Sequence, residues 1–141
     1  MKRIIGLTFL ILSLVLVMGL PAFADSNDSL IQSVIDDVNK ANVKISEKID
    51  HAKNDANKEI EKYNNKIQKD ELSSDEISKL NEKLNSKIDK IIDKLIKDTD
   101  EISAKTIKKA ARKGVQVNCE LIKVEIGGRE VLVDPLIVVA F

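Results

Sequence analysis

Tryptophan is absent from this 141-residue chain, and aromatic residues make up only 3% of it. Proteins that stack bases or sugars rely on aromatic side chains, so this scarcity argues against such ligands. The chain also has no excess of either charge, with 23 basic and 23 acidic residues. Because binding to nucleic acid normally requires a basic surface, the composition predicts no nucleic-acid partner.

Histidine and cysteine occur once each, as His51 and Cys119. A zinc site needs several such ligands, and a Cys–His nucleophile needs the pair side by side, which a His51 on the solvated face of a helix does not provide. Acidic residues cluster in the segment 70–76, but without the spacing of a calcium-binding loop. The sequence therefore predicts a non-enzymatic protein that holds no metal or cofactor.

A single cysteine excludes a disulfide within the chain, so packing alone must hold the fold. Cys119 follows Val115 and Val117 in an alternating pattern, which predicts that it is a small buried apolar residue. An intermolecular disulfide or a reactive thiol remains open as an alternative.

The first 24 residues have the features of a secretory signal peptide. Lys2 and Arg3 precede an uncharged apolar run over residues 4–20, and Pro21 is followed by Ala22-Phe23-Ala24, with small residues where a signal peptidase cuts. We expect cleavage after Ala24 and a secreted or cell-envelope location. An uncleaved anchor stays open, since the run is near the minimum length that crosses a bilayer. Abundant Lys, Asn and Ile with few Arg are typical of an AT-rich bacterial genome.

From Leu30 the apolar residues recur with a period of eleven residues. Val38, Ile49 and Ile60 share one position of this repeat, and the residues between the apolar positions are almost all polar. Eleven residues in three turns is close to a straight helix. The pattern predicts one long helix over about 27–68 with a narrow apolar stripe, typical of coiled-coil packing.

A second helix is expected over about 74–113. Ser73 and Glu76 form a capping box at its start, and Gly114 is suited to the left-handed position after its end. Its stripe has nearly the length of the first, and a short turn joins them. If the helices fold back on each other, Ala56 faces Ile88, and small residues face large ones along most of the seam, which favours an intramolecular antiparallel hairpin.

After Gly114 the apolar period changes to two, which predicts strands. The alternation shifts phase near Leu121, indicating a bulge, Gly127-Gly128 is a two-residue hairpin signal, and Asp134-Pro135 interrupts the return strand. The predicted fold is α+β: a long antiparallel two-helix hairpin over 25–113, followed over 114–141 by a small β-hairpin and an apolar C-terminus packed at the helix ends.

Two groups of residues are candidates for binding. The apolar tail and the neighbouring strand edge either pack on the helices or add to the sheet of a partner chain; these residues are Val131, Val133, Leu136, Ile137, Val138, Val139 and Phe141. A basic cluster at the end of the second helix either complements the helix dipole or touches an anionic surface; it consists of Lys105, Lys108, Lys109, Arg112 and Lys113.

The leading functional hypothesis is a secreted or cell-envelope structural protein that interacts with other proteins or with its own copies. The alternative is an amphipathic, surface-active protein that binds membrane or an anionic cell-wall polymer. The narrow, partly alanine stripe argues against this alternative.

Overall fold

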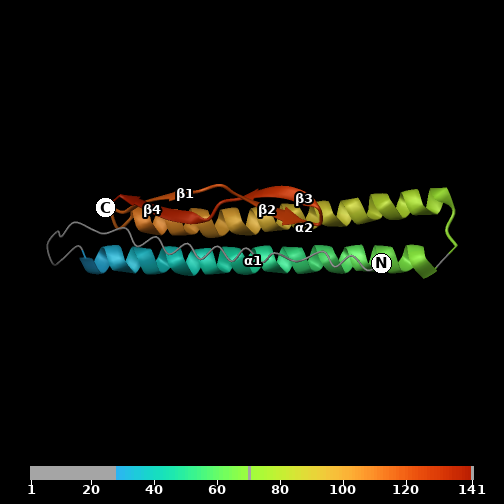
Figure 1. Ribbon diagram of the computed structural model, residues 1–141. Coiled ribbons are helices and arrows are strands. Elements are labelled where there is room, and N and C mark those ends of the chain that lie inside the picture. Colours follow the sequence, from blue (N-terminus) through green and yellow to red (C-terminus); the bar gives the residue numbers. More distant parts are fainter. Residues whose placement is uncertain (1–27, 70, 141) are drawn as a thin grey trace.

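The computed structural model describes residues 28–69 and 71–140, so the predicted signal peptide, Asp70 and Phe141 lie outside the described residues. Two long helices, α1 (Asp28–Lys69) and α2 (Ser74–Ala111), run antiparallel and side by side (Figure 1). Four strands follow: β1 (Gln116–Cys119), β2 (Ile122–Ile126), β3 (Arg129–Val133) and β4 (Leu136–Ala140). The α+β class and the helical hairpin are therefore confirmed.

The eleven-residue stripe is the face that α1 buries. Its buried residues follow the predicted spacing without exception; they are Val34, Val38, Ala41, Ile45, Ile49, Ala52 and Ala56. Ion pairs across the seam join Asp37 with Lys109 and Lys48 with Asp98.

Both ends of α2 are closed as the sequence predicts. The Ser73 hydroxyl accepts from the Glu76 N–H at 3.4 Å, and the Glu76 carboxylate accepts from the Ser73 N–H at 2.9 Å. At the other end, Gly114 has φ of 75° and the Val115 N–H donates to the Ala110 carbonyl. The helix ends two residues earlier than predicted, because the N–H groups of Lys113 and Gly114 bond three residues back in a tightened last turn.

The four strands make one long two-stranded ribbon in two segments. β2 pairs with β3 next to the turn, and β1 pairs with β4 farther from it, all antiparallel. Gly127 and Gly128 both have positive φ, as a type I′ turn requires. Between the two segments, the Glu120 N–H donates to the Pro135 carbonyl at 2.8 Å. This hydrogen bond joins the two strands of the ribbon at the place where the sequence predicts the phase shift near Leu121 and the break at Asp134-Pro135.

The ribbon lies along one side of the helix pair (Figure 1), with β2 and β4 over α1 and β1 and β3 over α2. It begins near the helix ends, as expected, but extends much farther and reaches Ala56 and Ile88. The lengths agree: the eleven residues from Gln116 to Ile126 span about 36 Å in a strand, and the 23 residues from Ile88 to Ala110 span about 35 Å in a helix. A narrow stripe cannot bury itself in two helices alone, and the ribbon supplies the third side of the core.

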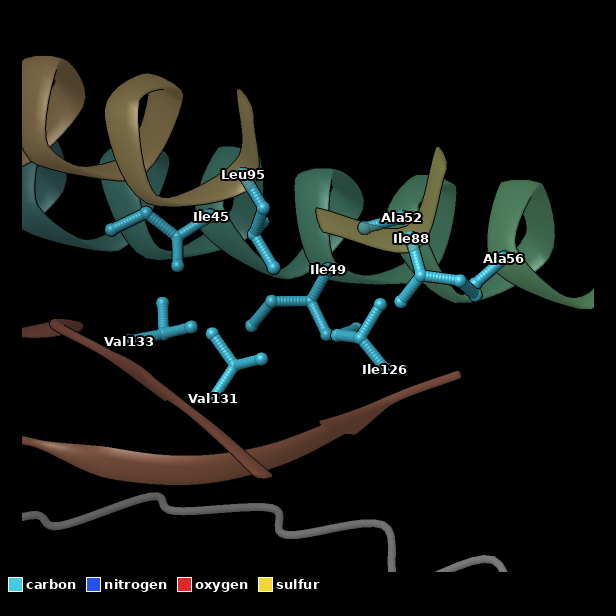
Figure 2. Packing of buried hydrophobic residues seen from close by; sticks show 9 residues of the cluster. All are labelled: Ile45, Ile49, Ala52, Ala56, Ile88, Leu95, Ile126, Val131 and Val133. Atoms are coloured by element: carbon cyan, nitrogen blue, oxygen red, sulfur yellow. The ribbon is translucent and has the colours of Figure 1, made fainter. Parts of the chain in front are cut away.

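The core consists of two clusters beneath the two ribbon segments. Figure 2 shows the first, in which Ile126, Val131 and Val133 point from the ribbon toward Ile45, Ile49 and Leu95 on the helices. The second joins Val34 and Val38 of α1 and Ala110 of α2 to Val117 and Leu136. Because both helices and the ribbon contribute to each cluster, the ribbon is part of the hydrophobic core.

Three polar contacts fix the ribbon on the helices. The Asn42 amide donates to the Leu136 carbonyl at 2.9 Å and accepts from the Leu136 N–H at 2.8 Å, so it takes the place of a neighbouring strand. The Ser103 hydroxyl donates to the Asp134 carbonyl at 2.9 Å. Beside the turn, Arg129 pairs with the Asp89 carboxylate of α2.

Candidate functional site

The structure divides the predicted tail and edge residues into two groups. Val131, Val133 and Leu136 are buried in the core clusters, so their side chains are not available to a partner of the folded chain. Val138 is half-buried, and Phe141 lies outside the described residues. Ile137 and Val139 are exposed on the other side of β4. The tail therefore packs on the helices with one face and exposes the other.

Ile137 and Val139 share the side of the ribbon that faces away from the helices with two further exposed aliphatic residues, Leu121 and Leu132. We call this surface the outer ribbon face; its four large aliphatic residues are Leu121 (64% exposed), Leu132 (54%), Ile137 (39%) and Val139 (50%). In the cross-strand register, Leu132 lies opposite Lys123 and Ile137 opposite Asn118. Four exposed aliphatic residues on one ribbon are a candidate contact surface for another protein.

Leu121 and Leu132 were missed in the sequence. The alternation offered a signal for Leu132, because Val131 and Val133 on either side of it are the inward positions of the strand. Leu121 was assigned to the predicted bulge, and only the finished ribbon shows that it is exposed beside the outward residues of β2.

The charges around the outer ribbon face are mostly acidic. Glu120, Glu125 and Glu130 are exposed on the ribbon, together with Lys123, which pairs with Glu130 at 3.1 Å. This fully exposed ion pair contributes little to stability. The outer ribbon face therefore carries aliphatic and charged side chains next to one another, and its net charge is negative.

Cys119 lies at the end of β1 and is exposed, so the prediction of a buried cysteine is wrong. The alternating pattern that buries Val115 and Val117 ends there, because the ribbon segment stops and the chain enters the break before β2. Partial burial nevertheless raises the pKa of the thiol, and the nearby Asp134 carboxylate raises it further. A raised pKa keeps the thiol protonated and lowers its reactivity.

The basic cluster at the end of α2 is partly neutralised by α1. Lys109 and Lys113 both pair with Asp37, at 2.8 and 3.2 Å, and Lys105 approaches Glu101 at 3.7 Å. The hydrogen bond from Lys109 is the largest cause that lowers the pKa of Asp37, and the one from Lys113 adds to it. Lys108 and Arg112 are exposed. The two pairs with Asp37 join the helices, the Lys105 pair lies within α2, and all three leave less positive charge for an anionic surface.

The residues that could take part in catalysis or metal binding do not lie close together. His51 lines a groove with Lys48 and Asp98 on the flank of the helices, whereas Cys119 lies on the ribbon. Across residues 28–69 and 71–140, no three His, Cys, Asp or Glu side chains are grouped as a metal ion would require. Glu76, one of the acids at the helix turn, is engaged in the capping box.

The two helices, as far as the structure describes them, contain no stretch apolar and long enough to cross a membrane. Comparisons with protein-family models, with curated proteins and with solved structures find no match to this chain.

Proposed function

We propose that this protein is a secreted or cell-envelope structural protein, without enzymatic activity, that works by associating with other protein chains, its own copies included. The supporting observation is the outer ribbon face. Leu121 and Leu132 are each more than half exposed there, whereas the aliphatic residues beside them, Ile122 and Val133, pack in the core. Burial of such surface on association is favourable by about 25 cal/mol per Å².

The outward-facing residues of the helices are less suited to binding a partner than the outer ribbon face. They are mostly Lys, Glu, Asp and Asn, which are well solvated and offer a partner little gain. The export signal predicted over residues 1–24 supports association at the cell envelope or outside the cell.

Site-specific cross-linking tests this proposal. A photo-reactive residue at position 132 is expected to give cross-linked products with protein, either in a concentrated solution of the purified chain or at the envelope of a cell that exports it. The matched control is position 43, because Val43 is also an exposed aliphatic residue (58%) but lies on α1. Equal or weaker cross-linking at position 132 than at position 43 in both settings would refute the proposal.

The alternative is binding to a membrane or to an anionic wall polymer. Its support is the exposed pair Lys108 and Arg112, and it is weakened by the engagement of Lys109 and Lys113 with Asp37. Sedimentation with liposomes that contain or lack anionic lipid separates the two proposals. Salt-sensitive binding to anionic liposomes supports the alternative, and failure to bind at any salt concentration removes it.

A further inference from the structure

A second surface lies where the ribbon does not reach. The ribbon extends to Ala56 and Ile88, and beyond these residues an open groove of about 140 Å³ runs between α1 and α2. We call it the distal groove; it is lined by Glu59, Lys62, Tyr63, Lys66, Leu80, Lys83, Leu84 and Lys87.

The distal groove lies on the flank of the helices that faces away from the ribbon. Its Glu59 and Lys87 form an ion pair across the seam, as Lys48 and Asp98 do. Glu59 lies eleven residues after Lys48, and Lys87 lies eleven residues before Asp98, so both pairs are on the same flank of the helices. The residues that touch the ribbon, Asn42 and Ser103, lie on the other side of the seam. The outer ribbon face and the distal groove therefore lie on opposite sides of the molecule and in different halves of its length.

The floor of the distal groove is apolar, and its charge is positive. Tyr63, Leu80 and Leu84 are half-buried there, whereas apolar seam residues beneath the ribbon, such as Ala56 and Ile88, are fully buried. Four lysines and one glutamate line the groove. That glutamate accepts hydrogen bonds from Lys62 and Lys87, which together lower the pKa of Glu59 to about 2. The groove is thus an apolar floor with a strongly basic rim.

We infer that copies of this chain associate head to tail, with the outer ribbon face of one copy on the distal groove of the next. The inference rests on the proposed function and names its partner. The two surfaces are complementary: aliphatic side chains with acidic ones among them meet an apolar floor with a basic rim. Pairing two outer ribbon faces would instead bring Glu120, Glu125 and Glu130 of both copies together.

The placement of the two surfaces determines the form of the assembly. A contact between two different patches is heterologous, and each added copy leaves one patch of each kind free at the ends. Because the patches lie on opposite sides of the chain, the contact gives open chains of copies in which the dimer is not an end point. Only four large aliphatic residues are exposed on the outer ribbon face, so each contact is expected to be weak.

Sedimentation equilibrium of the exported chain, residues 25–141, tests the inference. The wild type is expected to show an average mass that rises with concentration without stopping at the dimer, and to dissociate as salt is added. The groove variant is Lys66→Glu with Lys83→Glu, and the ribbon variant is Glu125→Lys with Glu130→Lys. Each variant alone is expected to self-associate at least about tenfold more weakly than the wild type. Because all four residues are exposed, both variants should keep the wild-type circular dichroism.

Mixing the variants provides the decisive measurement. The two variants, each of which self-associates only weakly alone, are expected to associate when combined, because each retains the surface that the other has lost. The control variant, Lys79→Glu with Lys90→Glu, changes the same charge at exposed positions outside the groove and should associate like the wild type.

Two results would overturn the inference. If the groove variant alone associates as strongly as the wild type, the contact does not use the groove and ribbon-to-ribbon pairing takes its place. If the wild type stays monomeric up to about 1 mM, its own copies are not the partner. In that second case, cross-linking from position 132 to a different protein would still support the proposed function, so the two failures can be told apart.

Discussion

Replacing Gly127 with alanine tests the packing of the ribbon on the helices. Gly127 is the first residue of the hairpin turn and has φ of 58°. A Cβ atom at this position would lie 2.5 Å from Cδ1 and 3.2 Å from Cγ2 of Ile88, and 3.4 Å from the Cβ of Ala56. The substitution therefore imposes both a strained backbone and a clash at the deepest point that the ribbon reaches.

The two costs can be separated with the neighbouring glycine. Gly128 has φ of 80°, but a Cβ there would meet nothing within 4 Å. Gly128→Ala should therefore cost about 1–2 kcal/mol for the left-handed backbone alone. Gly127→Ala should cost about 1–3 kcal/mol more, because Ile88 is only 2% exposed and its side chain has little room to move away. The effect of alanine on the unfolded chain is similar at both sites and cancels in the comparison.

Urea unfolding followed by far-ultraviolet circular dichroism measures both free energies. A third variant shows where the clash occurs: Ile88→Val removes the Cδ1 atom and by itself costs about 0.5–1.5 kcal/mol. In that background Gly127→Ala should lose most of its extra cost, giving a coupling of about 1 kcal/mol. Equal stability of the Gly127→Ala and Gly128→Ala proteins would refute the close contact between the turn and Ile88.

Three further substitutions test the helical hairpin. Ala56→Glu should destabilise the chain by about 3 kcal/mol or more, because it places an unpaired charge at a fully buried position; the exposed Asp55→Ala is the control, and similar melting temperatures would show that the seam is wrong. Ser73→Ala should cost about 1 kcal/mol in urea unfolding through loss of the α2 cap, and an unchanged midpoint would contradict the capping box. Two lysines lower the pKa of Glu59 from about 4.5 to about 2, so its carboxylate stabilises the fold above pH 4.5, and this contribution disappears as the pH falls from 4.5 to 2. Glu59→Gln should therefore melt below the wild type at neutral pH and together with it near pH 2; a constant difference at all pH values would exclude the ion pairs as the cause.

The local features of this protein could be predicted from the sequence because they depend on neighbouring residues. The eleven-residue stripe, the Ser73 cap, the left-handed Gly114 and the Gly127-Gly128 turn all follow from backbone geometry and short-range hydrogen bonds. The antiparallel seam was also accessible, since two stripes of equal length joined by a short turn have few other ways to bury themselves.

The candidate surfaces could be predicted only in part, because exposure depends on what lies opposite each residue. The sequence singled out Val131, Val133 and Leu136 along with Ile137 and Val139, and only the position of the ribbon on the helices separates the buried three from the exposed two. The exposure of Cys119 likewise results from the break between the two ribbon segments.

The sequence by itself determined two amphipathic helices, their caps and a β-hairpin at Gly127-Gly128, since periodicity and turn chemistry act within a few residues; the pairing of β1 with β4, which lengthens the hairpin into the ribbon, was not predicted. Only the tertiary structure decided how far the ribbon runs along the helices. That distance follows from long-range packing: Gly127 lets the turn approach Ile88 and Ala56, and Asn42 takes the place of a strand beside Leu136. With this packing, Ile122, Val131 and Val133 face the helices, so Leu121 and Leu132 beside them face outward, because successive residues of a strand point to opposite sides.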